Sequence, residues 1–171
     1  LSLVIKLDNL IFEIQNERGI STGLVETKST YFKEEIYSQR ELTNKALRSY
    51  LKLKKNIDDS FLNDAIREVS FSLDTLLEQL AIIRSGINVN DFENSLQKYS
   101  AINRHGISFI RHLQHLANDK EMVRLSDAYT NLLWLRERAG QERATLIWVF
   151  ASGHINAEYF RRLITYIESQ E

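Results

Sequence analysis

The sequence contains no proline and only six glycines in 171 residues. Proteins rich in strands need more of these turn-forming residues, so the composition favours long helices joined by short turns. There is also no cysteine, which excludes disulfides, thiolate metal ligands and cysteine nucleophiles within this chain. The longest apolar run, LIWVFA at residues 146–151, is far too short to span a membrane as a helix.

Acidic and basic residues nearly balance, and the net charge is −1. Nucleic-acid-binding domains usually carry a clear basic excess, so we expect no nucleic-acid partner. The chain begins at Leu1 rather than at methionine, and its apolar N-terminal segment is interrupted by Lys6 and Asp8, unlike a signal peptide. We therefore expect residues 1–171 to form a single helical domain that is part of a larger protein.

The spacing of apolar residues predicts about six helices. The first extends from Leu1 to the Gly19–Gly23 region, and its apolar stripe is Leu3, Leu7, Leu10/Ile11 and Ile14. Further helices are predicted at about 29–55, 60–86, 90–117, 119–153 and 156–171. Their candidate N-caps are Ser29 or Thr30, Asp58 to Ser60, Asn90, Asp119 and Asn156. Short connections favour antiparallel neighbours, so the predicted fold is all-α, an antiparallel up-and-down helical bundle.

The segment LRERAGQERATLIWVF, residues 135–150, places three arginines around Ala139-Gly140 before it becomes apolar. An α-helix turns by about 100° per residue, which puts Arg143 inside an apolar stripe centred on Leu132. The other members of that stripe are Leu125, Ala128, Ala139, Leu146 and Phe150. We therefore expect Arg143 to face the core, with Arg136 at the edge of the stripe and Arg138 in solvent.

The apolar stripe of the first helix likewise continues to Arg18. A buried guanidinium is costly unless it is paired and hydrogen-bonded, which leaves two interpretations. In the first, Arg18 and Arg143 form salt bridges with glutamates. The candidate glutamates are Glu13, Glu17 and Glu142. In the second, the two arginines meet across the bundle and bind a small anion, because arginine presents a flat fork of donors that suits a planar oxyanion.

Glycines beside both arginines favour the second interpretation. Gly140 costs about 1 kcal/mol relative to alanine inside a helix, so it indicates close approach of a backbone or a ligand. Gly19 and Gly23, near the expected helix end, could expose backbone N–H donors to an anion. Gly19 and Gly140 therefore join Arg18 and Arg143 as candidate ligand-binding residues.

Two segments, EIQNERGISTG (13–23) and LRERAGQERATLIWVFASGHINAEYFRRL (135–163), together resemble the nitrate- and nitrite-sensing (NIT) domain family of bacterial sensor proteins. The first matches an E-R-G-x-S-x-G-like signature. The second matches the family pattern at Glu137, Ala139, Gly140, Glu142, Arg143, Ala144, Leu146, Phe150, Ala151 and Gly153. The chain is shorter than is usual in the family, and His154 and Ile155 stand where an aromatic residue is more common.

The resemblance implies an all-helical ligand-binding domain. In the family, nitrate or nitrite lies between an arginine of the early motif and one of the late motif, and these positions match Arg18 and Arg143. Arg84, at the end of the third predicted helix, could be a further ligand contact or a charge that interacts with the helix C-terminus.

Catalytic and metal-binding patterns are absent from the sequence. His105, His112 and His115 could share one helix face, but no Glu-x-x-His or His-Glu-x-x-His motif accompanies them. No nucleophile elbow or phosphate-binding loop is present either. We therefore expect a protein that is not an enzyme and holds no metal or cofactor.

The resulting hypothesis is the input domain of a bacterial signal-transduction receptor that binds nitrate or nitrite and signals by helix displacement. We expect a homodimer, linked through membrane helices to an output module outside this chain. An extracytoplasmic (periplasmic) location in an inner-membrane protein is expected, with a cytoplasmic regulator as the alternative. Two other functions stay open. One is a structural or protein-interaction bundle with internally salt-bridged arginines, and the other is a sensor for a different anion such as a carboxylate. A cleft between Arg18 and Arg143 without carboxylates would favour the sensor.

Overall fold

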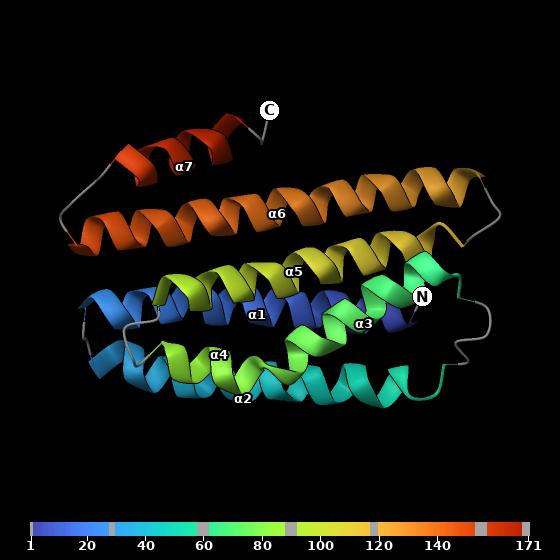
Figure 1. Ribbon diagram of the computed structural model, residues 1–171, viewed down its shortest axis with the longest axis horizontal. Helices are drawn as coiled ribbons and strands as arrows, with labels where there is room; N and C mark the ends of the chain where they lie inside the picture. The colour runs from blue at the N-terminus through green and yellow to red at the C-terminus, as the bar shows by residue number, and fades with distance from the viewer. Residues whose placement is uncertain are drawn as a thin grey trace.

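The computed structural model describes residues 2–27, 30–57, 62–87, 92–116, 120–152 and 157–168. Within these ranges there are seven helices and no strands. In chain order the helices are α1 (Ser2–Thr27), α2 (Thr30–Lys54), α3 (Asp64–Glu78), α4 (Leu80–Gly86), α5 (Phe92–Gln114), α6 (Lys120–Ser152) and α7 (Ala157–Glu168). They run back and forth along one long axis (Figure 1), which confirms the predicted all-α antiparallel bundle.

Helix α1 is the central element of the bundle and packs against α2, α5 and α6. The predicted apolar stripe is buried at every position, from Leu3 to Ile14. Val4, Gln15, Ser21 and Thr22 are buried as well, so α1 is covered on more than one side. A helix enclosed in this way holds its polar side chains against partners on several neighbours, and this places Glu17 and Arg18 inside the fold.

The single helix predicted for residues 60–86 is divided in the structure at Gln79. The backbone at Gln79 has φ −81° and ψ 0°, and its N–H bonds to the carbonyl groups of Leu76 and Leu77. This tightened turn separates α3 from α4. The N-cap of α3 is Asn63, whose side chain accepts a hydrogen bond from the N–H of Ile66 at 3.0 Å. Other expected cap residues lie outside the described residues: Ser29, Asp58, Asp59, Ser60, Asn90, Asp119 and Asn156.

The prediction that the first helix ends in the Gly19–Gly23 region is wrong, because α1 continues through both glycines to Thr27. A Cβ atom at Gly23 would lie 2.8 Å from the ring of Phe32. Gly23 therefore allows the aromatic ring of α2 to approach the backbone of α1, and its role is close packing rather than helix termination.

Gly106 on α5 allows a similar close contact within the apolar core. A Cβ atom there would lie 2.8 Å from Cδ1 and 2.9 Å from Cγ1 of Ile11, which is fully buried. Overpacking of this kind costs about 1–3 kcal/mol, whereas replacing a helical glycine by alanine gains up to about 1 kcal/mol. Gly106→Ala is therefore expected to lower the free energy of unfolding by up to about 2 kcal/mol, measured by urea denaturation. Gly19→Ala, where the new Cβ would meet its neighbour at an ordinary 3.5 Å, is the control. Equal stabilisation by both substitutions would contradict the packing argument.

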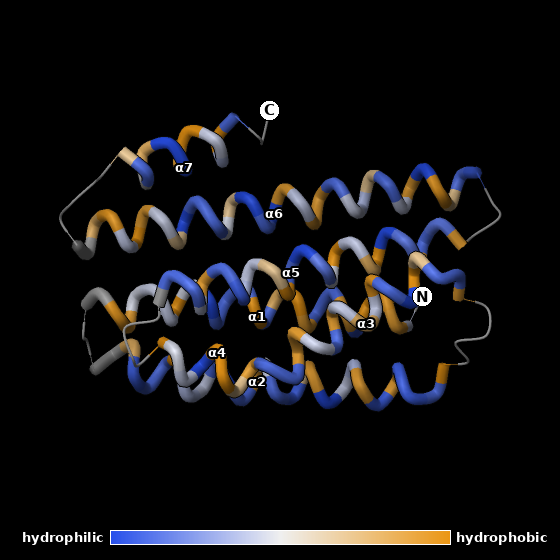
Figure 2. Tube along the Cα trace, viewed as in Figure 1, coloured by the Kyte–Doolittle hydropathy of each residue, from blue (hydrophilic) through white to orange (hydrophobic). Residues whose placement is uncertain are grey.

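The prediction that the apolar stripe of α6 faces the core is wrong. Leu132, at the centre of that stripe, is 63% exposed, Phe150 is 79% exposed and Arg143 is also exposed. The buried face of α6 instead carries Thr130, Leu133, Glu137 and Ala144. Figure 2 shows that apolar residues recur along the whole length of α6, which packs against α1 and α5. The face of α6 that contacts α1 and α5 is partly polar because it meets polar groups of these helices. The apolar stripe therefore predicted the wrong buried face.

The lengths and compositions of the described helices also bear on membrane insertion. None of them combines the length and the apolar content that a membrane crossing requires.

Candidate anion site

Arg18 is held inside the bundle, with only 1% of its surface exposed. Its Nη1 donates to Oε1 of Glu137 at 2.5 Å and to Oγ of Ser100 at 2.8 Å. Its Nε and Nη2 atoms are also buried, yet neither has an acceptor among the residues that the structure describes. One side of the guanidinium fork is therefore bonded and the other is not.

Glu137, in contrast, is surrounded by donors. Besides Arg18 it accepts hydrogen bonds from Gln15 Nε2 at 3.0 Å, Asn103 Nδ2 at 3.0 Å and Gln141 Nε2 at 2.8 Å. The carboxylate is thus largely satisfied by neutral amides. Leaving a buried donor unbonded costs about 1–3 kcal/mol, and more for a charged group. In this buried pair, therefore, two donor atoms of Arg18, Nε and Nη2, have no acceptor among the described residues.

The sequence-based candidates for the partner of Arg18 did not include Glu137. Glu13 instead accepts a hydrogen bond from Gln39 at 2.7 Å, and Glu17 binds other groups. Glu137 is nevertheless part of the late motif, three residues before Gly140 in the sequence. The motif therefore pointed to Glu137 as a candidate site residue. Glu137 was not chosen because the opposite face of α6 was predicted to be buried.

Two glycines allow the two arginines to approach the contact between α1 and α6. A Cβ atom on Gly140 of α6 would lie 2.9 Å from Nη2 of Arg18, and one on Gly19 of α1 would lie 3.5 Å from Nη2 of Arg143. Each guanidinium therefore lies against a glycine of the other helix. The neighbour that approaches Gly140 is thus an arginine side chain.

Although they share this helix contact, the two arginines line different hollows, so the expected single cleft without carboxylates between them is not observed among the described residues. Arg18 lines a hollow of about 320 Å³ between α1, α5, α6 and α7, whose wall includes Ser100, Arg104, Trp148 and Arg162. Arg143 lines a second hollow of about 360 Å³. The other residues of the second hollow are Asn16, Gly19, Ile20, Phe32, Glu35, Gln39 and Ile147. Arg143 makes no hydrogen bond or ion pair with any residue of the described ranges.

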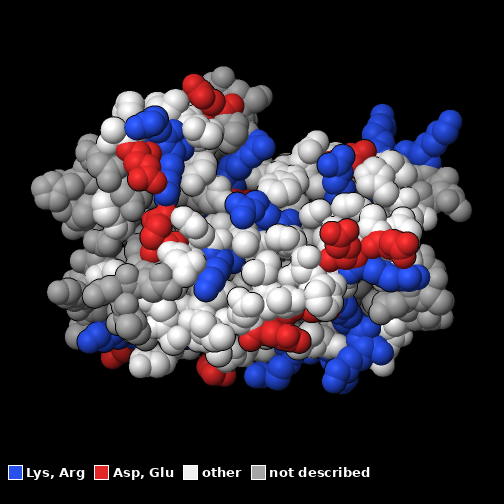
Figure 3. All heavy atoms as spheres, viewed as in Figure 1, with Lys and Arg blue, Asp and Glu red and all other residues white. Residues whose placement is uncertain are grey.

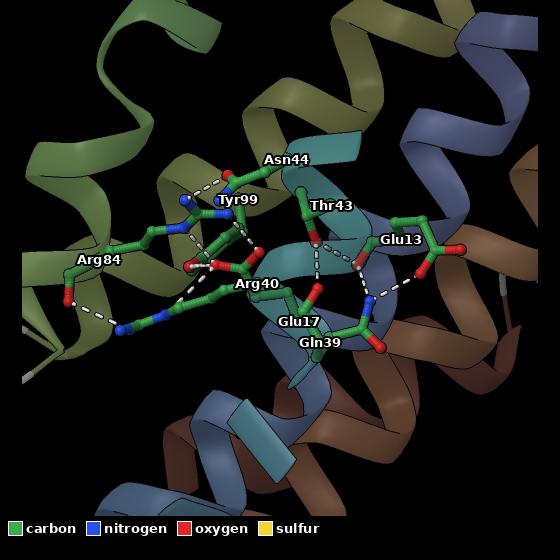
Figure 4. Close-up of polar contacts among 8 residues, drawn as sticks. All are labelled: Glu13, Glu17, Gln39, Arg40, Thr43, Asn44, Arg84 and Tyr99. Atoms are coloured by element: carbon green, nitrogen blue, oxygen red, sulfur yellow. Dashed lines mark hydrogen bonds and ion pairs between the residues drawn. The ribbon is translucent and has the colours of Figure 1, made fainter. Parts of the chain in front are cut away.

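A second buried ion pair joins Glu17 of α1 to Arg84 of α4 (Figure 4). Arg84 of α4 donates from Nε and Nη2 to the two carboxylate oxygens of Glu17, at 2.7 and 2.8 Å. Tyr99 donates its hydroxyl to the same carboxylate at 2.7 Å, and Arg40 lies 3.7 Å away. Asn44 accepts from Nη1 of Arg84 at 2.8 Å. The guanidinium of Arg84 thus donates two hydrogen bonds to Glu17. Arg84 lines neither of the two hollows.

The electrostatics of Glu17 follow from these contacts. Burial alone would raise the pKa of Glu17, but the hydrogen bonds and the positive charge of Arg84, with hydrogen bonds from Tyr99 and Thr43, hold it below its usual value of 4.5. Burial beside this carboxylate also raises the pKa of Tyr99. Glu17 is therefore ionised and Tyr99 neutral at neutral pH, and their contacts stabilise the packing of α4 and α5 against α1.

The three histidines considered as metal ligands have other contacts. The Nδ1 atoms of His105 and His112 lie 2.9 and 2.8 Å from backbone carbonyl oxygens of their own helix, and His115 lies 3.1 Å from Asp127. Throughout the described ranges, no three side chains of the metal-ligating types converge on one point.

These features define a class of protein: an all-α bundle whose central helix carries two buried ion pairs, one of them with unused donors beside a hollow. A family profile described as nitrate and nitrite sensing matches residues 9–171, and the chain belongs to this NIT family. Comparison with curated proteins gave no match.

Among solved structures, the chain is similar to one described as "Structure of the NasR transcription antiterminator", with a TM-score of 0.91 and 23% sequence identity. The match covers 99% of this chain and 46% of that chain, so this chain spans less than half the length of that protein. At this identity the likeness shows the fold alone. The comparisons support neither membrane anchoring nor a homodimer nor an extracytoplasmic location. Because the neighbour is a transcription antiterminator, the expectation of no nucleic-acid partner also gains no support.

Proposed function

We propose that residues 1–171 form the input domain of a signalling protein and bind nitrate or nitrite, without chemical conversion, at the contact between α1 and α6. The observation that carries this proposal is the buried guanidinium of Arg18, whose Nε and Nη2 have no acceptor in the described part of the chain. Nε and one Nη form an edge of the guanidinium that matches two oxygens of a planar oxyanion. The family to which the chain belongs supplies the identity of that oxyanion.

Arg143 adds to the positive potential at this contact. It lies against Gly19, the residue that follows Arg18, and it forms no ion pair within the described ranges, although Glu35 also lines its hollow. The charge of Arg18, by comparison, is already compensated by Glu137. A monoanion bound beside Arg18 would therefore complete the hydrogen bonding of one guanidinium and compensate the charge of the other.

Signalling would follow from the position of the site between two long helices. An anion that bridges groups of α1 and α6 favours one relative placement of these helices over another. Helices are stiff, so a small axial or rotational shift at the site reaches their ends. In a longer protein, assembled as a homodimer, such a shift would reach an output module that is covalently linked to this domain.

The direct test is calorimetric titration of the purified chain with sodium nitrate and sodium nitrite, with chloride and acetate as controls. Saturable binding is expected for the wild-type chain, and Arg18→Ala and Arg143→Ala are each expected to weaken it at least about tenfold, the typical effect of losing a hydrogen bond to a charged group. Circular dichroism would establish that both variants are folded. Gly140→Ala, whose new Cβ would displace Nη2 of Arg18, is expected to weaken binding while both arginines are retained.

The alternative function is a structural or protein-interaction bundle. It is favoured by the two buried ion pairs, Arg18–Glu137 and Arg84–Glu17. In each pair, a charged side chain of α1 is neutralised by one of α6 or α4, without a ligand. In that case a folded wild-type chain would bind neither nitrate nor nitrite. Binding of acetate in preference to both would instead indicate a carboxylate sensor.

A further inference from the structure

The hollow beside Arg18 is lined by cationic side chains from three different helices: Arg18 of α1, Arg104 of α5 and Arg162 of α7. Of these, only Arg18 was suggested by the sequence. The roles of the other two rest on the proposed anion-binding function. Arg104 lies outside both family motifs, and Arg162 lies in the second segment, beyond the positions that match the family pattern.

Arg104 lies on the same face of α5 as Ser100, about one helical turn away. Ser100 accepts a hydrogen bond from Nη1 of Arg18 at 2.8 Å, so α5 directs this face toward the buried guanidinium. Arg104 lines the hollow, is exposed, and makes no hydrogen bond or ion pair with a residue in the described ranges. Its long side chain is therefore available to a ligand.

Arg162 has a different role because its charge is already compensated. Its Nη1 donates to Glu93 of α5 at 2.5 Å and its Nη2 donates to Glu158 of α7 at 2.6 Å. The first of these bonds connects α7 to α5 at the hollow, which Trp148 and Tyr166 also line. On the face of the molecule that Figure 3 shows, basic and acidic side chains are interspersed rather than gathered into a surface of one sign.

Two of the three arginines at the hollow are paired with carboxylates. Arg18 is paired with Glu137, and Arg162 with both Glu93 and Glu158, whereas Arg104 has no counter-ion among the described residues. The unused hydrogen-bond donors belong to Arg18, and the uncompensated charge belongs to Arg104. A small planar monoanion would satisfy both.

We propose that Arg104 is a second cationic contact for the anion bound by Arg18, and that the Arg162–Glu93 pair holds α7 over this site. The ligand class is a small planar oxyanion, represented by nitrate and nitrite. Because α7 forms one wall, an occupied hollow is expected to hold α7 more firmly against α5 and α6. Ligand binding would thereby directly change how firmly α7 is held.

The test compares the dissociation constant for sodium nitrate of the wild-type chain with those of Arg104→Gln and Arg104→Glu, by calorimetry at fixed ionic strength in a chloride-free buffer. Arg104→Gln is expected to weaken binding about tenfold and Arg104→Glu to abolish it. Arg111→Gln is the matched control, because Arg111 is also exposed, lies about two turns further along α5 and does not line the hollow. It is expected to bind within about twofold of wild type.

Hydrogen exchange provides a second readout. Nitrate is expected to slow amide exchange in α7 of the wild-type chain and of Arg111→Gln, but not of Arg104→Glu. If Arg104→Gln and Arg104→Glu both bind nitrate as Arg111→Gln does, the inference is overturned, while the proposed function stands. If the wild-type chain binds no nitrate or nitrite, the proposed function fails and the inference fails with it. Loss of binding in Arg143→Ala but not in the Arg104 variants would place the anion in the second hollow and would also overturn the inference.

Discussion

Replacing Glu17 by glutamine is expected to lower the free energy of unfolding by about 3–5 kcal/mol, the usual cost of breaking a buried ion pair by removing one partner. Glu17 is fully buried and binds Arg84 through both carboxylate oxygens. Without the carboxylate, the largely buried guanidinium of Arg84 has lost its counter-ion, and the hydroxyl of Tyr99 has lost its charged acceptor. Urea denaturation followed by circular dichroism at neutral pH would measure the change.

A more exposed ion pair serves as the control for this substitution. Lys54 and Asp74 approach each other to 2.5 Å, but the Asp74 side chain is 37% exposed. Asp74→Asn is therefore expected to cost no more than about 1 kcal/mol. The double variant Glu17→Gln/Arg84→Met is expected to recover part of the loss, because it removes the unpaired charge as well. An effect of Glu17→Gln no larger than that of Asp74→Asn would show that the buried pair contributes little.

The stabilisation by Glu17 should depend on pH in a defined direction. Because the pKa of Glu17 is lower in the folded state than its usual value of 4.5, its contribution is fully present above pH 4.5. It is lost as the pH falls through the folded-state pKa. The difference in unfolding free energy between wild type and Glu17→Gln is therefore expected to be constant above pH 4.5 and to narrow in more acidic solution.

Replacing Glu137 by glutamine is expected to destabilise the ligand-free protein by a similar amount, about 3–5 kcal/mol, because it removes the carboxylate paired with Arg18. The proposed ligand should reverse part of this loss. A bound nitrate would supply the missing negative charge beside Arg18, so Glu137→Gln is expected to bind nitrate more tightly than wild type. At a nitrate concentration of 100 times the dissociation constant, the folded state gains about 2.7 kcal/mol. Thermal or urea unfolding in nitrate and in chloride would measure this rescue.

Glu17→Gln is the matched control for the rescue experiment. It also leaves a largely buried arginine without its carboxylate, but Arg84 lines neither hollow. Nitrate is therefore expected to stabilise Glu137→Gln much more than Glu17→Gln. Equal stabilisation of the two variants would indicate a general salt effect rather than an anion site at Arg18.

The sequence alone was sufficient for the helical class and for the environment of α1. The absence of proline and the scarcity of glycine predicted long helices, and the spacing of Leu7, Ile11 and Ile14 led correctly to a buried Arg18. These predictions succeeded because α1 is enclosed by other helices, so its apolar residues face them whichever neighbour they meet. The two motifs also predicted the NIT family, which the family profile confirms.

Only the tertiary structure decided which face of α6 is buried and which charged groups pair. Periodicity selected the side with Leu132, whereas the fold buries the side with Glu137, since a polar face can be buried when its partners supply hydrogen bonds. Arg18 and Glu137 are 119 residues apart in the sequence, and Glu17 and Arg84 are 67 apart. Local pattern carries no information about such pairs, because the energy that selects them arises only when the helices come together.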